Sequence, residues 1–287
     1  MELLFGGLAI GAVYALLAIG IVLIHRASGV VNFAQGELMM VSAYAYSVVS
    51  ESINSPLVQL AAALAAGAIG GLLCFAVVHL LLPRSSRLAQ VIGTLALLIL
   101  LQAAARYLFT DIPRRAEPWI FGEQNLDILG VNLPVNSAVI LVVTVIATLA
   151  LFYWQGSTLY GRAVRAVAED SWRAALCGIH VRSTLAVSWA VGGMLAGIAG
   201  VLISPLTGVF PNMGADILLP AFIGAVMGGF SSILGCLVGS LALGILQTYA
   251  VIFFGGATKE VVIFAIFLAV VLLRPSGLFT VAQTRRI

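Results

Sequence analysis

The chain has 287 residues, of which 62% are hydrophobic and only 9% are charged, and its formal net charge is +3. A soluble domain carries about 25% charged residues, so this composition excludes an ordinary water-soluble globular protein, and the small net charge gives no support for nucleic-acid binding. Several apolar runs are long enough to cross a hydrocarbon core, which takes about 20 residues. The sequence therefore predicts an all-α polytopic membrane protein, folded as one transmembrane domain over residues 1–287.

Successive apolar runs predict eight or nine transmembrane helices. The second and seventh runs are short and contain Gly, Ser or Pro, so we expect either of them to be broken or re-entrant. The first run lacks a basic segment before it and a small-residue cleavage site, and is interpreted as a retained helix rather than a signal peptide. The runs fall near residues 3–24, 36–50, 57–82, 89–109, 135–155, 184–204, 214–230, 233–254 and 260–274.

The placement of basic residues predicts the orientation, because Lys and Arg concentrate on the cytoplasmic side of a membrane protein. With residues 156–183 in the cytoplasm, ten basic residues fall inside and four outside. This places the N-terminus outside, the C-terminus inside, and residues 110–134 as the main external loop. The inside set is Arg26, Arg84, Arg87, Arg162, Arg165, Arg173, Arg182, Arg274, Arg285 and Arg286, and the outside set is Arg106, Arg114, Arg115 and Lys259.

Two patterns within the apolar runs bear on packing. Glycines recur four positions apart, and small residues at this spacing let helix backbones approach closely. The segment VLIHRASGV (22–30) resembles VLISPLTGV (201–209), and the predicted topology puts the two copies at opposite faces. An inverted repeat would have this arrangement, with the transport path near the repeat interface; chance similarity is the alternative in so apolar a chain. The glycine pairs are Gly7/Gly11, Gly67/Gly71, Gly193/Gly197, Gly224/Gly228 and Gly235/Gly239.

A polar island, GRAVRAVAEDSWRAALCGIHVR (161–182), carries six charges between long apolar runs. Its alanine-rich part, Ala163 to Leu176, predicts one helix of about four turns. A helix with a stripe of small apolar residues suits docking into a groove of a partner protein. The alternative is a helix lying on lipid headgroups, although the mixed signs of its charges weigh against simple anionic-lipid binding. The stripe is Ala163, Val164, Val167, Ala168, Ala175 and Leu176.

The sequence contains no nucleotide site and no catalytic arrangement. A P-loop requires a Gly-rich turn ending in Lys-Ser or Lys-Thr, whereas the only lysine, Lys259, is followed by Glu260. The three cysteines are scattered and the three histidines lack ligand spacing, so neither a disulfide framework nor a metal site is expected. We therefore expect a chain that is not an enzyme, does not hydrolyse nucleotide itself and has no cofactor of its own.

Polar residues beside the second run mark a candidate translocation path. An ionisable group at membrane depth is a functional candidate, and Glu37 is the main one. The alternatives are a structural acid at a helix N-terminus and direct handling of a proton or solute. Gln102 is expected to make an interhelical hydrogen bond, and Pro205, Pro211 and Pro220 to interrupt helices along the path. The path set is Asn32, Gln35, Gly36, Glu37 and Gln102.

Four segments together resemble the LivH-type permease of the branched-chain amino acid ABC importers. They are GGLAIGAVYALLAIG (6–20), GVVNFAQGELMMVSAY (29–44), GRAVRAVAED (161–170) and LLRPSGLF (272–279). Gln35 stands where the family's N-F-A-H-G-E segment usually has His. The pattern A-E-D at 168–170, with Ala175 and Gly178-Ile179, resembles the cytoplasmic coupling loop of ABC permeases.

The resemblance implies a bacterial inner-membrane permease that works by alternating access. Its implied partners are a second, LivM-like permease, two LivG/LivF-like ATPases that use the ATP, and a periplasmic or lipid-tethered binding protein; membrane lipid surrounds it. The solute would be a branched-chain amino acid or a related small polar solute such as urea or a short amide. A proton-coupled secondary transporter that uses Glu37 is the alternative. The implied ATPase-coupling residues, within 161–178, are Arg165, Ala168, Glu169, Asp170, Arg173, Ala175 and Gly178.

Overall fold

A computed structural model describes residues 2–82, 86–120, 125–128, 131–230, 232–256 and 259–273. Arg84, Arg274, Arg285 and Arg286 of the predicted inside set, and residues 274–279 of the LLRPSGLF segment, lie outside these ranges. The helices are α1 (Glu2–Ser28), α2 (Gln35–Ser52), α3 (Pro56–Phe75) with a π-helical extension (Ala76–Leu81), α4 (Arg87–Phe109), α5 (Val135–Ser157), α6 (Leu159–Glu169), α7 (Ser171–Leu176), α8 (Val181–Thr207), α9 (Met213–Gly228), α10 (Ile233–Phe254) and α11 (Lys259–Leu273).

The prediction of an all-α polytopic membrane protein is confirmed. Within the described ranges, six helices are long and apolar enough to cross a membrane: α1, α3 with its extension, α4, α5, α8 and α10. Shorter apolar helices span Met213–Gly228 and Val261–Val270. The expectation that Pro205 and Pro220 interrupt helices is wrong, because α8 and α9 continue through them. Neighbouring helices and local adjustment let a membrane helix tolerate proline.

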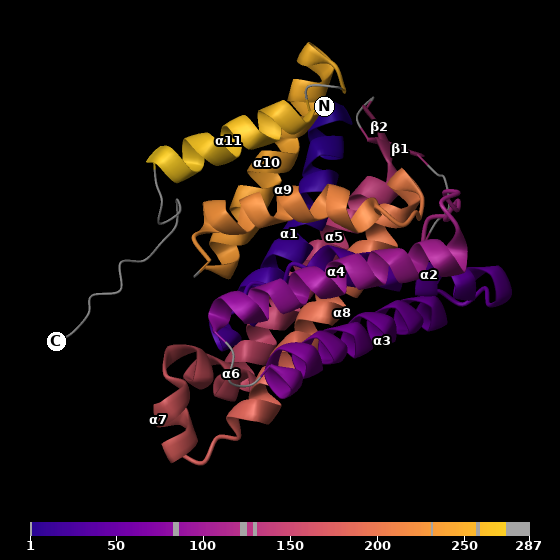
Figure 1. The fold of residues 1–287 in the computed structure, drawn as a ribbon. Coiled ribbons are helices and arrows are strands. Elements are labelled where there is room, and N and C mark those ends of the chain that lie inside the picture. The colour runs from indigo at the N-terminus through magenta and orange to yellow at the C-terminus, as the bar shows by residue number, and fades with distance from the viewer. Residues whose placement is uncertain are drawn as a thin grey trace.

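One element was not anticipated from the sequence. Strand β1 (Asn125–Ile128) pairs antiparallel with β2 (Val131–Pro134) just before α5. The preceding residues are attached to the bundle, since Arg114 and Val209 exchange backbone hydrogen bonds of 2.9 Å and the Tyr46 hydroxyl donates to the Glu117 carbonyl. The described part of the predicted external loop therefore forms a folded cap over one end of the bundle, while α6 and α7 lie at the other end (Figure 1).

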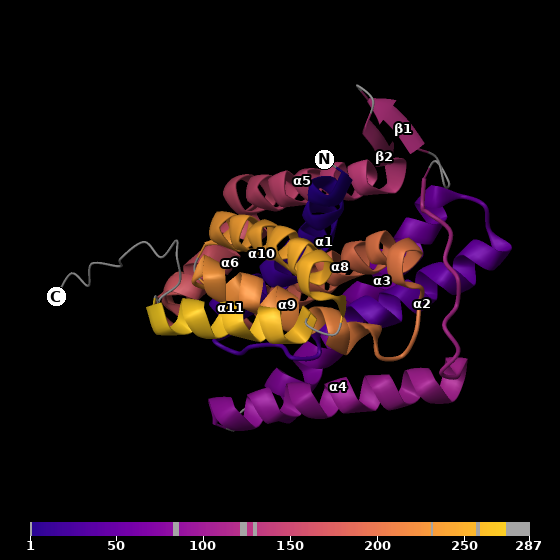
Figure 2. The same ribbon diagram turned by 90° about the horizontal axis from the view of Figure 1, so that it is seen from above.

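The helices are arranged around α1. In its most apolar stretch 89% of the residues are buried, against 11% in α4. Seen from above, α4 and α5 form opposite edges, with α1, α8, α9 and α10 between them (Figure 2). Because an apolar helix with little buried surface must face lipid or another protein, α4 lies on an exposed side of this chain.

The structure supports the inverted repeat. Helices α1 and α8 both have 27 residues, and the hydroxyls of Ser28 and Thr207 each donate to the carbonyl four residues back. Each helix is followed by a glycine with positive φ, Gly29 at 71° and Gly208 at 73°, and then by a short helix. In the same way, α1 packs along α10 as α8 packs along α3.

The two copies run in opposite directions. Gly20 of α1 lies against the carbonyl of Gly192 in α8, whereas Ile10, earlier in α1, lines one cavity with Leu206, later in α8. Earlier residues of α1 thus lie against later residues of α8, so the two helices are antiparallel. The chain is therefore two similar units, α1–α4 and α8–α11, joined by α5–α7 and inserted with opposite orientation.

The glycine pairs act as predicted where α3 crosses α8. A Cβ atom on Gly67 would overlap the carbonyl oxygen of Gly193, and a Cβ on Gly193 would overlap that of Gly67. Lipid gives helices no hydrophobic drive to associate, so close backbone packing of this kind is a main source of their attraction.

Candidate functional site

The polar island forms two helices, not the single four-turn helix expected. Helix α6 ends at Glu169 and α7 begins at Ser171, with Asp170 in extended conformation between them. The Asp170 carboxylate accepts from the backbone N–H groups of Trp172 and Arg173, both at 3.0 Å. Alanine-rich composition favoured an unbroken helix, but an aspartate that caps free N–H groups starts a new helix instead.

Gly178 ends this helix pair. It has a φ of 82°, its N–H donates to the Ala175 carbonyl, and the Ile179 N–H donates to the Ala174 carbonyl. These bonds form a Schellman motif, for which glycine is the preferred residue. In this structure Gly178 shapes the end of α7 and is exposed, and a contact with a partner at this residue stays a prediction.

The predicted coupling residues all lie on this helix pair. Most of them, Arg165, Glu169, Arg173 and Ala175, are exposed, while Ala168 and Asp170 are half-buried. Arg173 also pairs with Asp170 at 3.1 Å. The predicted apolar stripe is only partly available to a partner, because Val164 and Val167 are buried in this chain. These two side chains anchor α6 to the bundle. The sequence pattern alone did not distinguish apolar residues that pack within the chain from apolar residues that dock onto a partner.

Of the large exposed apolar side chains here, only Leu176 was singled out from the sequence. Trp172 is 73% exposed, Leu176 72%, Leu159 77% and Tyr160 60%. A signal was present, since a tryptophan within a charged, alanine-rich helix is typical of an interface anchor. Beside them a groove of about 600 Å³ runs between α6 and the start of α8, lined in part by Tyr160, Ile179 and His180. The helix pair therefore presents exposed apolar anchors and mixed charges, and a groove borders α6.

The second candidate region is where α2 and α9 meet. A Cβ on Gly36 would overlap the carbonyl oxygen of Gly214, so the first turns of these two helices are in direct backbone contact. Glu37 lies in the first turn of α2, is fully buried, and neither of its carboxyl oxygens has a hydrogen-bond partner among the described residues. The position matches the predicted N-terminal acid; a role in handling solute stays a prediction.

Asn32 and Gln35 hold the linker between α1 and α2 in place. Both are fully buried. The Asn32 amide donates to Gln35 Oε1 at 3.0 Å, and Gln35 Nε2 donates to the Gly192 carbonyl at 2.7 Å. Asn32 Oδ1 in turn accepts from the Ala34 N–H. In this conformation the pair ties the first unit to α8.

Gln102 lies apart from that pair. Its amide donates to Asn212 Oδ1 at 2.8 Å, and Arg106 donates to the same oxygen at 2.7 Å. The expected interhelical hydrogen bond is therefore present, and it joins α4 to the linker before α9. Earlier in α4, the Thr94 hydroxyl accepts from the Phe33 N–H. Eight helical residues separate Thr94 from Gln102, about 12 Å along the axis, so both linkers reach toward the middle of α4.

The region thus combines two discontinuous helices whose N-terminal turns meet inside the bundle. Helix N-termini carry free N–H groups and a partial positive charge. In transporters built from inverted repeats, such half-helix ends line the substrate site. The predicted path residues Gly36 and Glu37 are at this meeting point, Asn32 and Gln35 are packed beside it, and Gln102 is at its outer edge.

Known proteins resemble this chain over nearly its full length. A family model described as "Branched-chain amino acid transport system / permease component" matches residues 3–271. The permease protein BraD of Pseudomonas aeruginosa, from a high-affinity branched-chain amino acid transport system, is 31% identical over 97% of this chain and 95% of its own length. LivH of Escherichia coli is also 31% identical, covering 97% and 94%.

More distant proteins also resemble the chain. The ribose import permease RbsC of Escherichia coli is 29% identical over 85% of this chain and 76% of its own. The solved structure "PsaBC from Streptococcus pneumoniae in complex with Fab" superposes with a TM-score of 0.52 over 96% of this chain and 93% of that one, at 14% identity, which supports the fold alone. None of these descriptions points to proton coupling. The chain belongs to the family of permease components of branched-chain amino acid transport systems.

Proposed function

We propose that this chain is one permease subunit of an ABC importer for branched-chain amino acids or a related small polar solute. The observation that carries the proposal is the full-length match to permeases of such systems. The sequence has no P-loop, so ATP is hydrolysed by separate ATPase subunits. The remaining partners are a second, LivM-like permease and a binding protein that delivers the solute from outside.

The ATPase subunits contact α6 and α7. This helix pair is the polar end of an otherwise apolar bundle, and it carries exposed apolar anchors beside a groove. With α6 and α7 in the cytoplasm, the folded cap of residues 110–134 faces outward and meets the binding protein. This orientation agrees with the distribution of Lys and Arg along the chain.

Transport proceeds by alternating access at the meeting point of α2 and α9. Closure of the ATPase dimer displaces α6 and α7, and Val164 and Val167 transmit the movement because they are packed into the bundle. The backbones of α2 and α9 are in contact at Gly36 and Gly214, so a solute passes here only when this contact opens. Opening it exposes the buried carboxyl of Glu37 to the path.

Co-purification followed by reconstitution tests the proposal. Affinity capture of this chain from bacterial membranes should bring down two ATPases and a second permease. Proteoliposomes holding the captured complex and its binding protein should take up leucine only with ATP, and vanadate should stop the uptake. Uptake that survives vanadate and collapses with the proton gradient would overturn the proposal in favour of the secondary transporter. Substituting Glu169→Arg should abolish uptake while membrane insertion stays normal.

A further inference from the structure

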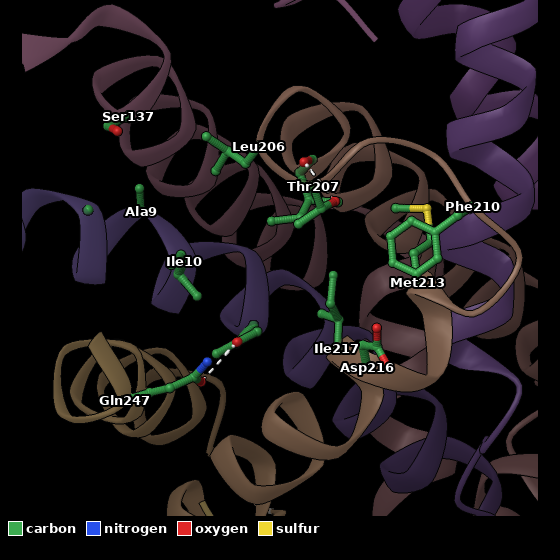
Figure 3. A pocket seen from close by; sticks show the side chains of 13 residues that line it. Ala9, Ile10, Ser137, Leu206, Thr207, Phe210, Met213, Asp216, Ile217 and Gln247 are labelled. Atoms are coloured by element: carbon green, nitrogen blue, oxygen red, sulfur yellow. Dashed lines mark hydrogen bonds between the residues drawn. The ribbon is translucent and has the colours of Figure 1, made fainter. Parts of the chain in front are cut away.

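A cavity at the α6–α7 end of the bundle lies apart from the α2–α9 meeting point. Its volume is about 460 Å³, and its walls come from the π-helical end of α3 and the first turns of α8. The cavity at the hairpin end is different, because it is lined by Met213 and Asp216, on either side of Gly214, and so belongs to the candidate region described above (Figure 3). Among the described residues, none from α2 or α9 lines the α3–α8 cavity.

The wall from α3 has an unusual backbone. Its last six residues, Ala76–Leu81, form a π-helix, a wide turn that is rare and often found at functional sites. In this turn the His79 ring packs against Phe75, with centroids 5.3 Å apart, and edge-on to the fully buried Trp189 at 5.8 Å. His79 Nε2 is shielded from solvent and has no hydrogen-bond partner among the described residues. An unpaired buried nitrogen is costly, so a ligand that reaches this atom gains by pairing with it.

The wall from α8 is positively charged. Arg182 lies in the first turn of α8, is exposed, and forms no ion pair with any residue in the described ranges. Helix α8 begins here without a side-chain cap, and a helix N-terminus carries a partial positive charge. The described residues that line the cavity include no acid. The charge of this wall therefore favours a negatively charged ligand.

The rest of the lining is apolar and continues onto the outer surface of α3. Phe75, Leu80 and Leu185 form the other walls of the cavity. From Leu80 the exposed side chains of Leu73 and Ile69 follow along one face of the helix. Because α3 with its extension is long and apolar enough to cross a membrane, this face suits acyl chains. A ligand that matches the whole surface has an anionic head and hydrocarbon chains.

We propose that the α3–α8 cavity binds the headgroup of an anionic phospholipid. The phosphate accepts hydrogen bonds from the Arg182 guanidinium and from His79 Nε2, and the acyl chains lie along Leu80, Leu73 and Ile69. Contacts of arginine with phosphate are charge-assisted, strong and directional. Basic pockets between membrane helices on the cytoplasmic side bind such headgroups, and the proposed function places this end of the bundle in the cytoplasm. The inference rests on the proposed function only for this choice of leaflet.

The bound headgroup joins the two inverted units at one end of the bundle. Helix α3 belongs to the first unit and α8 to the second, and only residues 177–180 separate α7 from α8. A phosphate held by both His79 and Arg182 therefore restrains the start of α8, close to the helix pair that contacts the ATPases in the proposed function. A zwitterionic lipid, whose ammonium group offsets its phosphate, restrains it less.

Native mass spectrometry tests the site on the full-length chain, purified in detergent with its co-purifying subunits and titrated with lipid in the absence of ATP and solute. Phosphatidylglycerol should bind about tenfold more tightly than phosphatidylcholine with the same acyl chains, as loss of a net charge predicts. Glycerol 1-phosphate, which has the head but no chains, should not compete at millimolar concentration. Phosphatidylglycerol with a photoreactive group in its acyl chain should crosslink to the peptide that contains residues 69–80.

Three variants locate the binding energy. Arg182→Gln should raise the dissociation constant for phosphatidylglycerol about tenfold to a hundredfold, as loss of a charged hydrogen-bond partner predicts. His79→Phe keeps a ring between Phe75 and Trp189 and should raise it about threefold to tenfold. Arg162→Gln is the matched control, because Arg162 is exposed at the same end but lines a different groove, and it should leave the dissociation constant unchanged.

An unchanged dissociation constant in Arg182→Gln, an equal loss in Arg162→Gln, competition by glycerol 1-phosphate, or crosslinks confined to helices other than α3 and α8 would each overturn the site. If Arg182→Gln weakens ATPase binding but leaves lipid affinity unchanged, the arginine belongs to the ATPase contact and the lipid site is refuted. ATP-driven uptake on the same preparation separates the two proposals: its absence, with lipid affinity as expected, refutes the proposed function and leaves the lipid site.

Discussion

Replacing Trp172 by alanine should weaken ATPase binding without harming the fold. The tryptophan is 73% exposed, so its removal leaves little cavity in this chain. A tryptophan offers up to about 250 Å² of contact area, and the exposed share is about 180 Å². At about 25 cal/mol per Å² its full burial by a partner is worth at most about 4.5 kcal/mol. Interface tryptophans lose about 2–4 kcal/mol on truncation, which corresponds to a dissociation constant about 30-fold to 1,000-fold higher.

The affinity is measured by titrating purified ATPase subunits into the permease pair held in lipid nanodiscs. Tyr107→Ala is the matched control, because this aromatic is 89% exposed but lies near the end of α4, away from α6 and α7. It should leave ATPase affinity unchanged. An unchanged dissociation constant for Trp172→Ala, with insertion equal to wild type, would refute the assignment of α7 as part of the contact.

Three further substitutions test the structural framework. Asp170→Ala removes the cap of α7 at a cost of about 1 kcal/mol, so amide exchange over residues 171–177 should quicken about fivefold; Asp170→Asn keeps a capping oxygen, and equal exchange in both variants would contradict the capping role. Gly193→Val should lower the melting temperature of the purified permease, since overpacking costs about 1–3 kcal/mol and the new side chain would overlap α3; Gly156→Val, at an open position, is its control, and a similar loss in both would rule out the helix contact as the cause. Gln35→Ala removes the bond to the Gly192 carbonyl and leaves the buried Asn32 amide without its acceptor, a loss of about 1–3 kcal/mol, and wild-type thermal stability in that variant would show that these bonds contribute nothing.

The helices were predictable because membrane burial imposes a simple rule on sequence. A hydrocarbon core demands long apolar runs, and every predicted run corresponds to a helix. The β1–β2 hairpin was not predictable in the same way, since its short strands have no such length or composition requirement. The break at Asp170 was missed for a related reason, because helix propensity is a weak average preference and a single capping side chain overrides it.

The two candidate sites also differed in how far they could be predicted from the sequence. Charge composition was enough to locate α6 and α7, because charged residues are scarce elsewhere in the chain. It did not separate Val167, which anchors α6 inside the chain, from Trp172, which points outward. Nothing in the sequence indicated that Asp216 lies beside Tyr14 and Gln247. Only the packing of helices distant in the chain brings it to one cavity with Tyr14 and Gln247.

The inverted repeat indicates how the chain is arranged when it faces the opposite side of the membrane. The two units share a helix arrangement and have opposite orientation, yet they differ locally: α9 borders a cavity, whereas Glu37 at the start of α2 is fully buried. Because the two units share one fold, either unit can adopt either arrangement. If the units exchange them, Asp216 becomes enclosed while Glu37 comes to border a space open to the other side of the membrane. This one structure therefore serves as a template for the opposite-facing state, and distances measured between spin labels on the two units during turnover should alternate between the two arrangements.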